Sequence, residues 1–337
     1  MARGGKDRVV WGVISTADIG LKKVIPGMMK SRHIEIRAIA SRALPAAKKA
    51  AKKLGIPVAY GSYEELLDDP EIEAIYNPLP NHLHVPLTLA AARKGKHVLC
   101  EKPLSITAAE AETLRSAPRG IIIAEAFMVR CHPQWIRARE IVRSGKLGTL
   151  RAVQSLFSYY NVDPQNVRNM ADIGGGALYD IGCYPIVVSR YIFGSEPRRV
   201  ISLVDRDPNF RTDRTTSAIL DFGEGRQATF TVSTQAAAYQ RVHILGTKGR
   251  LEVQIPYNAP QGAATTLFLD SGKQLGDASA KPIRLPMADQ YQLQGEAFSR
   301  MVRGKEKVAF GLEDAILQMR VLDALFRSER SGSWEKP

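Results

Sequence analysis

The residues best suited to chemistry stand where a short apolar run ends. Residues 98–100 are followed directly by Glu101, Lys102 and Pro103, which is typical of a buried strand whose carboxyl end emerges into a crevice. Lysine is rarely buried, and Pro103 restricts the residue before it to extended geometry. The pattern predicts that Lys102 is aimed at a ligand. A solvated lysine at a strand end would give the same pattern, and a cis Lys102–Pro103 bond stays open.

A second reactive group follows three consecutive glycines, Gly174 to Gly176. Asp180 and Tyr184 are four residues apart, so on a helix they share one face. Tyrosine has a pKa of about 10, which a nearby ammonium lowers because it favours the phenolate. We expect Lys102 to supply that ammonium if the two halves of the chain close over one crevice. The alternative is that Tyr184 is a core residue and Asp180 a helix-start residue.

The first half of the chain carries a scaffold for such a crevice. Six strand-length apolar runs alternate with helical segments, which predicts a doubly wound parallel sheet. The runs cover residues 9–14, 34–40, 58–60, 74–76, 98–100 and 121–124. The carboxyl ends of such strands form the ligand crevice. The residues placed there are Ser15, Ser41, Asn77, Lys102 and Glu125.

The first turn has the layout of a dinucleotide site. Ser15, Ala17 and Gly20 stand where the usual motif has three glycines, and small residues still allow a pyrophosphate to approach the helix start. A plain strand-to-helix turn would fit equally. The following helix should run to about Ser31, with a distortion at Pro26.

The end of the second run bears on the choice of cofactor. An acidic residue there favours NAD, whereas an arginine accommodates the 2′-phosphate of NADP. Ser41 and Arg42 occupy this place, so the sequence predicts NADP over NAD. A solvated arginine at a strand end is the alternative.

The second half has a different pattern. A helix at residues 133–144 and a long strand at 149–160 precede a polar stretch at 161–172. Residues 200–253 alternate in strand-length pieces broken by Gly-containing turns, which predicts a large antiparallel sheet. Helices at about 289–302 and 312–328 close the chain. We therefore expect a Rossmann domain at residues 1–126 and an α+β domain at 127–337.

Composition narrows the classes of protein. The 337 residues carry a net charge of +13, but the basic residues are scattered and no nucleic-acid-reading motif accompanies them, so we expect an anionic cofactor rather than a nucleic acid. No apolar run has the length of a membrane helix, and the start lacks a signal-peptide core. Three cysteines without metal-ligand spacing suit a reducing compartment. The expectation is a cytoplasmic protein with no metal and no membrane partner.

The chain resembles the glucose-fructose oxidoreductase / inositol dehydrogenase (Gfo/Idh/MocA) family over nearly its whole length. The segments that carry the likeness are residues 12–20, 77–84, 101–103, 125–128 and 174–184. The resemblance implies a nicotinamide domain and a second domain with an open antiparallel sheet, which commonly joins subunits into a homodimer or homotetramer. Many members have histidine at the place of Tyr184. The tyrosine is similar to the branch of NADP-dependent D-xylose dehydrogenase, glucose-fructose oxidoreductase and dimeric dihydrodiol dehydrogenase.

The resemblance also implies roles for single residues. Lys102 and Tyr184 would be catalytic, and Asp180, Arg168 and Asp172 would contact substrate hydroxyls. The cofactor would be bound by Ser15, Thr16, Ala17, Asp18, Ile19, Ser41, Arg42, Pro78, Leu79, Asn81, His84, Glu101, Lys102 and Glu125. Serine and alanine at positions 15 and 17 depart from the glycines of the family motif.

The expected reaction is the NADP-dependent oxidation of a sugar hydroxyl, such as C1 of an aldose to the lactone, or its reverse. Tyr184 would take the proton while a hydride passes to the nicotinamide. A ketoreductase of a nucleotide-linked sugar and a dihydrodiol-type dehydrogenase are alternatives, and so is an NADP-binding regulator without turnover. The sugar, the physiological direction and the choice of dimer or tetramer stay open.

Overall fold

The structure is a computed structural model that describes residues 8–337. The chain divides into two compact units: one holds the chain up to Met128 together with Asp289–Ile316, and the other holds Val129–Ala288 and Leu317–Pro337. The basic start of the chain, residues 1–7, where we expected no signal peptide, lies outside the described residues.

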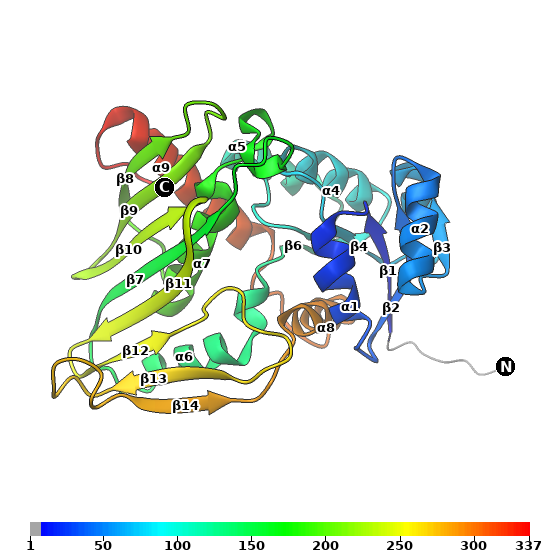
Figure 1. Ribbon diagram of the computed structural model, residues 1–337. Coiled ribbons are helices and arrows are strands. Elements are labelled where there is room, and N and C mark those ends of the chain that lie inside the picture. Colours follow the sequence, from blue (N-terminus) through cyan, green and yellow to red (C-terminus); the bar gives the residue numbers. More distant parts are fainter. Residues whose placement is uncertain (1–7) are drawn as a thin grey trace. The chain divides into compact units, whose positions relative to one another are not determined.

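The first unit contains a parallel sheet of six strands in the order β3-β2-β1-β4-β5-β6 (Figure 1). The strands are β1 (Val9–Ile14), β2 (Ile34–Ala40), β3 (Val58–Tyr60), β4 (Ala74–Asn77), β5 (His97–Cys100) and β6 (Ile123–Glu125). This order confirms the predicted doubly wound sheet, whose direction of winding switches between β1 and β4. Ligand crevices of such sheets lie outside the carboxyl ends of the strands at that switch.

The helices of the first unit connect these strands, and two of them begin at a capping side chain. Ser62 Oγ accepts a hydrogen bond from the backbone N–H of Glu65, and Thr107 Oγ1 accepts one from that of Glu110. The helices are α1 (Ile25–Met28), α2 (Leu44–Leu54), α3 (Tyr63–Asp68), α4 (His84–Arg93), α5 (Ala108–Glu112) and α8 (Gln290–Val302).

The first helix begins differently from the predicted one. Residues Gly20–Val24 form a π-helical turn, in which the N–H of Ile25 bonds the carbonyl of Gly20, and α1 follows with Pro26 in its first turn. Proline is tolerated there because its missing N–H has no intrahelical partner. The distortion therefore precedes Pro26 instead of occurring at it.

Helix α8 packs with the first unit although it lies far along the chain. The Trp11 indole donates a hydrogen bond to Ser299 Oγ, and its ring lies 5.2 Å from that of Phe298. Asp289, which caps α8, forms an ion pair with Lys30 at 2.7 Å. Residues 289–316 are thus grouped with the first unit, whereas the sequence-based division at 126/127 put them in the second.

The second unit is built on a sheet of eight strands in the order β14-β13-β12-β11-β7-β10-β9-β8. Only β7 and β10 pair in parallel, so the predicted mostly antiparallel sheet is confirmed. The strands are β7 (Leu150–Tyr160), β8 (Arg199–Arg206), β9 (Asp213–Gly223), β10 (Arg226–Ser233), β11 (Gln235–Gly246), β12 (Gly249–Val253), β13 (Thr265–Asp270) and β14 (Lys281–Leu285).

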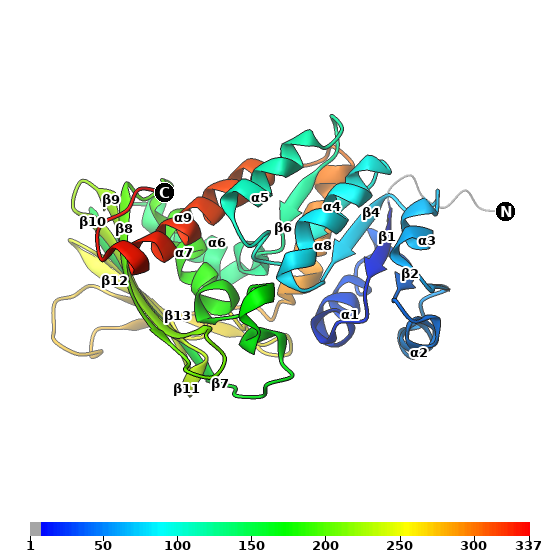
Figure 2. The ribbon, with the colours of Figure 1, turned by 90° about the horizontal axis from the view of Figure 1, so that it is seen from above.

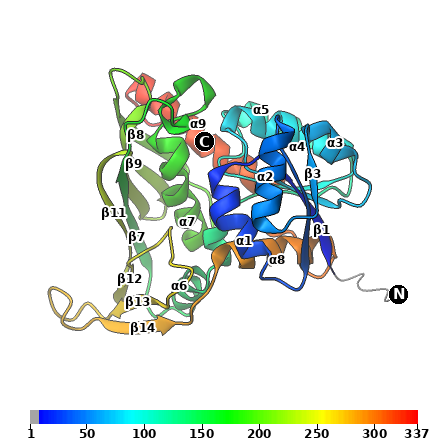
Figure 3. The ribbon, with the colours of Figure 1, turned by 45° about the vertical axis from the view of Figure 1, so that its right-hand side comes forward.

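Helices α6 (Pro133–Arg143) and α7 (Cys183–Phe193) lie on one face of this sheet (Figures 2 and 3). Residues 183–192 of α7 are all buried, consistent with a helix that is apolar on every side. Helix α9 (Leu312–Ser331) closes the chain. The polar stretch before α7 forms short 3₁₀ turns at Val167–Asn169 and Ala171–Ile173.

The described residues were also compared with the requirements of a membrane helix and of a metal site. None of the helices within residues 8–337 has the length and hydropathy that a bilayer crossing needs. In the same residues no group of three or more His, Cys, Asp or Glu side chains could hold a metal ion. Cys100, Cys131 and Cys183 are thiols, two of them buried.

Candidate active site

The predicted dinucleotide turn follows β1 directly. Ser15 has a φ of +85°, a backbone conformation that costs a non-glycine residue energy and is concentrated at functional sites. Its Oγ accepts a hydrogen bond from the N–H of Ala17 at 3.3 Å. Asp18 and Ile19 are exposed, and Asp18 pairs with Lys22 at 2.7 Å. The turn therefore keeps a left-handed residue where the usual motif has glycine, and the serine hydroxyl ties it to the following residues.

Arg42 lies just beyond the carboxyl end of β2. Its side chain is exposed, and the structure of residues 8–337 records no ion pair or hydrogen bond for its guanidinium. Its charge acts on Tyr63, whose pKa burial raises and Arg42 lowers. Ser41 Oγ accepts a hydrogen bond from the N–H of Ala43. A cation in this setting can bind an anionic group of a ligand without first losing a carboxylate partner.

The loop after β4 is held by buried side chains. Asn77 donates hydrogen bonds to the carbonyl of His84 and to Thr88 Oγ1, and it accepts one from the N–H of Leu79. Pro78 and Leu79 are buried, and Asn81 is half-buried. Asn77 thus shapes the loop on which the predicted cofactor contacts lie.

His84 sits at the end of this loop and is only 1% exposed. Its Nδ1 lies 2.7 Å from the carbonyl oxygen of Pro103 and its Nε2 lies 2.6 Å from that of Leu79. Burial lowers the pKa of His84 to about 4, against the opposing effect of the two carbonyls. A neutral ring donates only one hydrogen bond, whereas both short contacts would be satisfied by a charged one. Both carbonyl oxygens can only accept, so the two contacts together favour a ring that carries a proton on each nitrogen.

Lys102 follows β5 and is half-buried. The Lys102–Pro103 peptide bond is cis. On one side Glu101 accepts a hydrogen bond from the buried Tyr76 hydroxyl at 2.7 Å. On the other, Glu125 at the end of β6 accepts one from the N–H of Leu104 at 2.8 Å. The first unit thus brings the predicted cofactor residues to one edge of its sheet, beyond the carboxyl ends of five strands.

In the second unit, Asp180 lies at the centre of a hydrogen-bonded group. Its Oδ2 accepts a bond from the Tyr159 hydroxyl at 2.6 Å and one from Arg168 Nε at 2.9 Å. Asp180 lies in a π-helical turn, Leu178–Gly182, that leads into α7. The turn that we expected to be α-helical is therefore wider, as at other functional sites.

Arg168 interacts electrostatically with Asp180 and with two tyrosines, Tyr159 and Tyr184. The charge of Asp180 raises the pKa of Arg168, and Tyr159 and Tyr184 raise it further. Burial and then the charge of Asp180 raise the pKa of Tyr159. The Arg168 side chain is 43% exposed, so solvent screens these effects. Arg168 is thus a cation of this unit whose pKa Tyr184 raises, whereas the sequence suggested Lys102 alone as the cation near the tyrosine.

Tyr184 itself is 6% exposed and packs in an aromatic cluster. Its ring lies 5.3 Å from that of Tyr257 and 6.0 Å, edge-on, from that of Phe157. The Tyr257 hydroxyl is hydrogen-bonded to Ser155. The cluster fixes the plane of the Tyr184 ring, which a positioned acid or base requires.

Asp213, at the start of β9, caps the turn that carries Asp180. It is 1% exposed, and its Oδ2 accepts hydrogen bonds from the N–H of Leu178 at 2.6 Å and from Thr216 at 3.0 Å. Burial raises the pKa of Asp213 to about 7. A Cβ at Gly176 would lie 1.9 Å from Asp213 Oδ1. The lack of a side chain at Gly176 therefore makes room for the protein's own Asp213 carboxylate.

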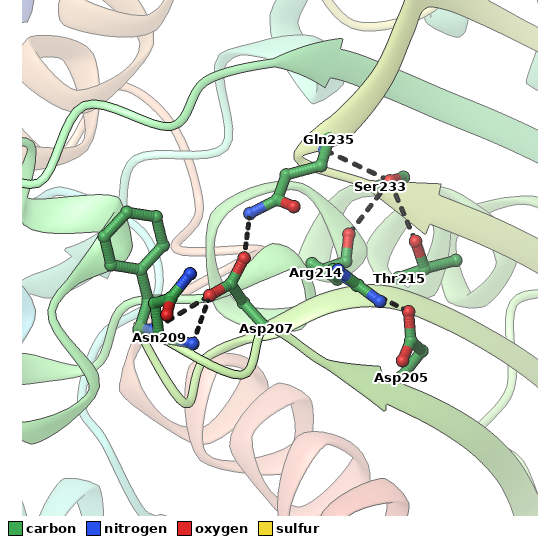
Figure 4. A network of polar contacts seen from close by, with 8 residues as sticks. Asp205, Asp207, Asn209, Arg214, Thr215, Ser233 and Gln235 are labelled. Atoms are coloured by element: carbon green, nitrogen blue, oxygen red, sulfur yellow. Dashed lines mark hydrogen bonds and ion pairs between the residues drawn. The ribbon is translucent and has the colours of Figure 1, made fainter.

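Asp213 follows the loop that joins β8 to β9, and polar contacts hold this loop (Figure 4). Asp207 accepts hydrogen bonds from the N–H groups of Asn209 and Phe210 and from the Gln235 amide. Arg214 pairs with Asp205 at 2.6 Å. These contacts fix the loop between β8 and β9, and with it the carboxyl group that caps the turn.

Sequence reasoning missed Tyr159 and Asp213. Tyr159 lies 21 residues before Asp180, which it contacts, and Asp213 lies 35 residues after Leu178, whose N–H it accepts. The regular alternation of β7 could have shown on which face Tyr159 lies, but not its partner. Asp172, predicted to bind substrate, is exposed on a 3₁₀ turn, and within residues 8–337 its side chain has no ion pair or hydrogen bond.

A parallel six-stranded sheet with a small-residue first turn, in a chain that also holds a second sheet-based unit, is typical of dinucleotide-binding oxidoreductases. Comparison with known proteins agrees. The family described as "Oxidoreductase family, NAD-binding Rossmann fold" matches residues 9–119, and "GFO/IDH/MocA C-terminal domain" matches residues 135–252. The chain belongs to the GFO/IDH/MocA oxidoreductase family, and it is an NAD(P)-dependent enzyme.

Three relatives illustrate the likeness. An uncharacterized oxidoreductase of Rhizobium meliloti is 47% identical over 98% of this chain and 99% of its own. D-xylose 1-dehydrogenase (NADP(+)) 2 of Haloferax volcanii is 36% identical over 96% of this chain and 98% of its own. The crystal structure of a 3-ketoreductase from Actinomadura kijaniata with NADP and TDP-benzene has a TM-score of 0.88 and 29% identity, and covers 95% of this chain and 98% of that one.

Proposed function

We propose that the enzyme oxidises a sugar hydroxyl with NADP, most simply C1 of an aldose to the lactone, or catalyses the reverse reduction. The observation that carries this proposal is the Asp180 group beside Tyr184: a carboxylate, a guanidinium and a phenol together offer the donors and acceptors that a polyhydroxylated substrate needs. The likeness to an NADP-dependent D-xylose 1-dehydrogenase supports it. Three thiols suit the reducing cytoplasm, where we place the enzyme.

The cofactor assignment depends on how the residues fit an anionic dinucleotide. Small residues at the turn after β1 leave room for a pyrophosphate, and Arg42 is exposed without a carboxylate partner in residues 8–337. We assign the 2′-phosphate to Ser41 and Arg42, and the nicotinamide to the 78–81 loop and Glu101. When bound, the oxidised nicotinamide accepts a hydride from the sugar carbon.

The roles of the protein's own groups follow from their chemistry. Tyr184 takes the hydroxyl proton as general base. Lys102 donates a hydrogen bond to the reacting oxygen and favours the phenolate, and Arg168 adds a second positive charge. Asp180, Arg168 and Asp172 hold the other hydroxyls. The proposal requires Lys102 and Tyr184 to reach the same oxygen in the working enzyme.

The proposed function predicts the outcome of an assay with purified protein, NADP or NAD, and a panel of pentoses and hexoses. We expect NADPH to form with at least one aldose, measured by its absorbance. We expect kcat/KM for NADP to exceed that for NAD by roughly 10–100-fold, because a charged hydrogen bond contributes about 1.5–3 kcal/mol. A preference for NAD would overturn the use of Arg42.

Arg42→Ala is the matched variant for this assay. It should raise the KM for NADP by about tenfold or more and leave the KM for NAD nearly unchanged, since only NADP carries the 2′-phosphate. Equal effects on both cofactors would mean that Arg42 acts on the fold and not on the phosphate.

A second candidate reaction has its own support. The structural likeness to a 3-ketoreductase solved with NADP and TDP-benzene favours reduction of a nucleotide-linked keto sugar. A dihydrodiol substrate would use the same residues. The same assay run with NADPH and a keto sugar linked to a nucleotide distinguishes the two, because only the ketoreductase consumes NADPH there while leaving free aldoses unoxidised.

We extend the proposal to the assembly of the enzyme, a homodimer or homotetramer formed through the eight-stranded sheet. Leu203, Ser217, Thr231 and Leu156 lie directly opposite one another across β8, β9, β10 and β7, and so on one face. Leu203 is 78% exposed. Exposed apolar residues grouped on a sheet face are typical of a protein interface.

Leu203→Asp is therefore expected to dissociate the assembly, because it places a charge in an apolar contact. The measurement is the molar mass in solution, by sedimentation or light scattering, over a range of protein concentrations. Leu275→Asp is the control: Leu275 is 99% exposed but lies in the loop between β13 and β14. A monomeric wild-type protein would contradict this part of the proposal.

A further inference from the structure

The peptide group that joins Pro103 to Leu104 is held at both of its polar ends by side chains. Its carbonyl oxygen lies 2.7 Å from His84 Nδ1, and its N–H donates to Glu125 Oε1 at 2.8 Å. His84 is 1% exposed, Glu125 7% and Leu104 0%. Two buried side chains thus hold one peptide plane, and we call this arrangement the Pro103–Leu104 clamp.

The clamp joins three neighbouring strand ends. His84 follows β4, the clamped peptide follows β5, and Glu125 ends β6, and these strands are adjacent in the order β4-β5-β6. His84 is fixed in turn, because its Nε2 lies 2.6 Å from the carbonyl oxygen of Leu79. The orientation of the peptide is therefore set by elements on both sides.

The clamp begins one residue after Lys102. The ring of Pro103 fixes its φ. Holding its carbonyl oxygen in place therefore also sets its ψ. The path of the backbone between Pro103 and Lys102 is fixed as a result. On the other side of the lysine, the backbone N–H of Glu101 donates a hydrogen bond to the carbonyl oxygen of Asn77 at 2.9 Å, and the Glu101 carboxylate accepts one from the Tyr76 hydroxyl. Backbone contacts therefore fix the root of the Lys102 side chain from both directions.

We propose that His84 and Glu125 are positioning residues for Lys102 and that neither is a ligand of the cofactor. The inference deepens the proposed function, because it rests on Lys102 acting at the reacting oxygen. It gives a new role to two residues that we had expected among the cofactor contacts. Both ring nitrogens of His84 face protein carbonyl oxygens, and a carboxylate oxygen of Glu125 accepts a protein N–H. Misplacing a catalytic group by about 1 Å can lower the rate about a hundredfold.

The test compares Glu125→Leu with wild type in kcat and in the Kd of NADP. Loss of the clamp should lower kcat about 10–100-fold and change the Kd of NADP less than twofold. Glu125→Gln, which keeps a carbonyl acceptor, should recover most of the loss. His84→Leu removes the other half of the clamp and should give the same pattern, which keeps the test valid if Glu125→Leu does not fold.

Two controls separate the clamp from general damage. Ser299→Ala removes a buried hydrogen bond to Trp11 in the same unit and should lower the unfolding temperature without the fall in kcat. The double variant Lys102→Met/Glu125→Leu should be no slower than Lys102→Met alone, because a positioning residue acts only through the group it positions. Multiplying effects would overturn the inference.

Two further outcomes would decide the roles of Glu125 and Lys102. A Kd for NADP raised tenfold with kcat unchanged would show that Glu125 is a cofactor ligand, and would refute the clamp. If Lys102→Met itself keeps full turnover, the proposed function fails. The clamp is then judged by amide exchange at Leu104, which should be faster in Glu125→Leu than in wild type, and an unchanged rate overturns it.

Discussion

Replacing Tyr184 by phenylalanine should lower turnover by about a hundred- to ten-thousand-fold, the range that a general acid or base contributes, while the Kd of NADP stays within about twofold of its wild-type value. The substitution removes one oxygen and keeps the ring that packs against Phe157 and Tyr257. Because the aromatic cluster survives, the loss can be attributed to chemistry. The measurements are kcat by NADPH formation and cofactor affinity by titration.

Lys102→Met belongs to the same prediction. Methionine keeps most of the length of the side chain and removes the charge, so the variant should lose about a hundredfold or more in turnover with NADP binding kept. Tyr257→Phe is the matched control: it deletes a buried hydroxyl from the same cluster and a hydrogen bond to Ser155. It should cost about 1–2 kcal/mol of stability and little turnover. Near-normal turnover in Tyr184→Phe or Lys102→Met would end the assignment.

Gly176→Ala should destabilise the second unit by about 3 kcal/mol or more, since it combines backbone strain with overpacking. Gly176 has a φ of +120°, which side-chain-bearing residues rarely adopt, and the new Cβ would lie 1.9 Å from Asp213 Oδ1. Asp213 would have to move, and its bond to the N–H of Leu178 would be lost. Because Leu178 begins the turn that carries Asp180, activity should fall together with stability.

The measurement for Gly176→Ala is the free energy of urea unfolding, with kcat at a temperature where the variant is folded. Gly262→Ala serves as the control, because nothing lies within 4 Å of a Cβ built there and its φ is not in the left-handed region. It should change stability by less than about 1 kcal/mol. A Gly176→Ala protein as stable as the Gly262→Ala protein would refute the role given to Asp213.

The strands of the first unit could be predicted because each is marked by residues that are neighbours in the sequence. Buried parallel strands give continuous apolar runs in the sequence, and residues 9–14, 74–76 and 98–100 are runs of this kind. The caps Ser62 and Thr107 were recognisable because a cap and its partner lie three residues apart. For the same reason the sequence predicted the strand-end residues, which directly follow or end these runs: Ser15, Ser41, Asn77, Lys102 and Glu125.

What the sequence did not reveal depends on contacts between distant residues or on small changes in helix geometry. Apolar spacing does not separate a π-helical turn from an α-helical one, so both turns, at 20–24 and 178–182, were expected to be ordinary helix. The partners of Asp180 lie 12 residues and 21 residues before it, Arg168 on a 3₁₀ turn and Tyr159 near the end of β7. His84 was assigned to the cofactor on the family resemblance, and only coordinates show that carbonyl groups of Pro103 and Leu79 face its ring.

The return of α8 to the first unit has a consequence for how this polypeptide is made. Trp11 and its partner Ser299 are 288 residues apart, so the core of the first unit cannot be completed until the intervening residues have been synthesised. Domains that are continuous in sequence can fold as they emerge from the ribosome, whereas here the unit that is begun first must wait for a segment that follows the other unit's sheet. A nascent chain of this protein therefore leaves the Trp11 side of that core without its partners until α8 has been made.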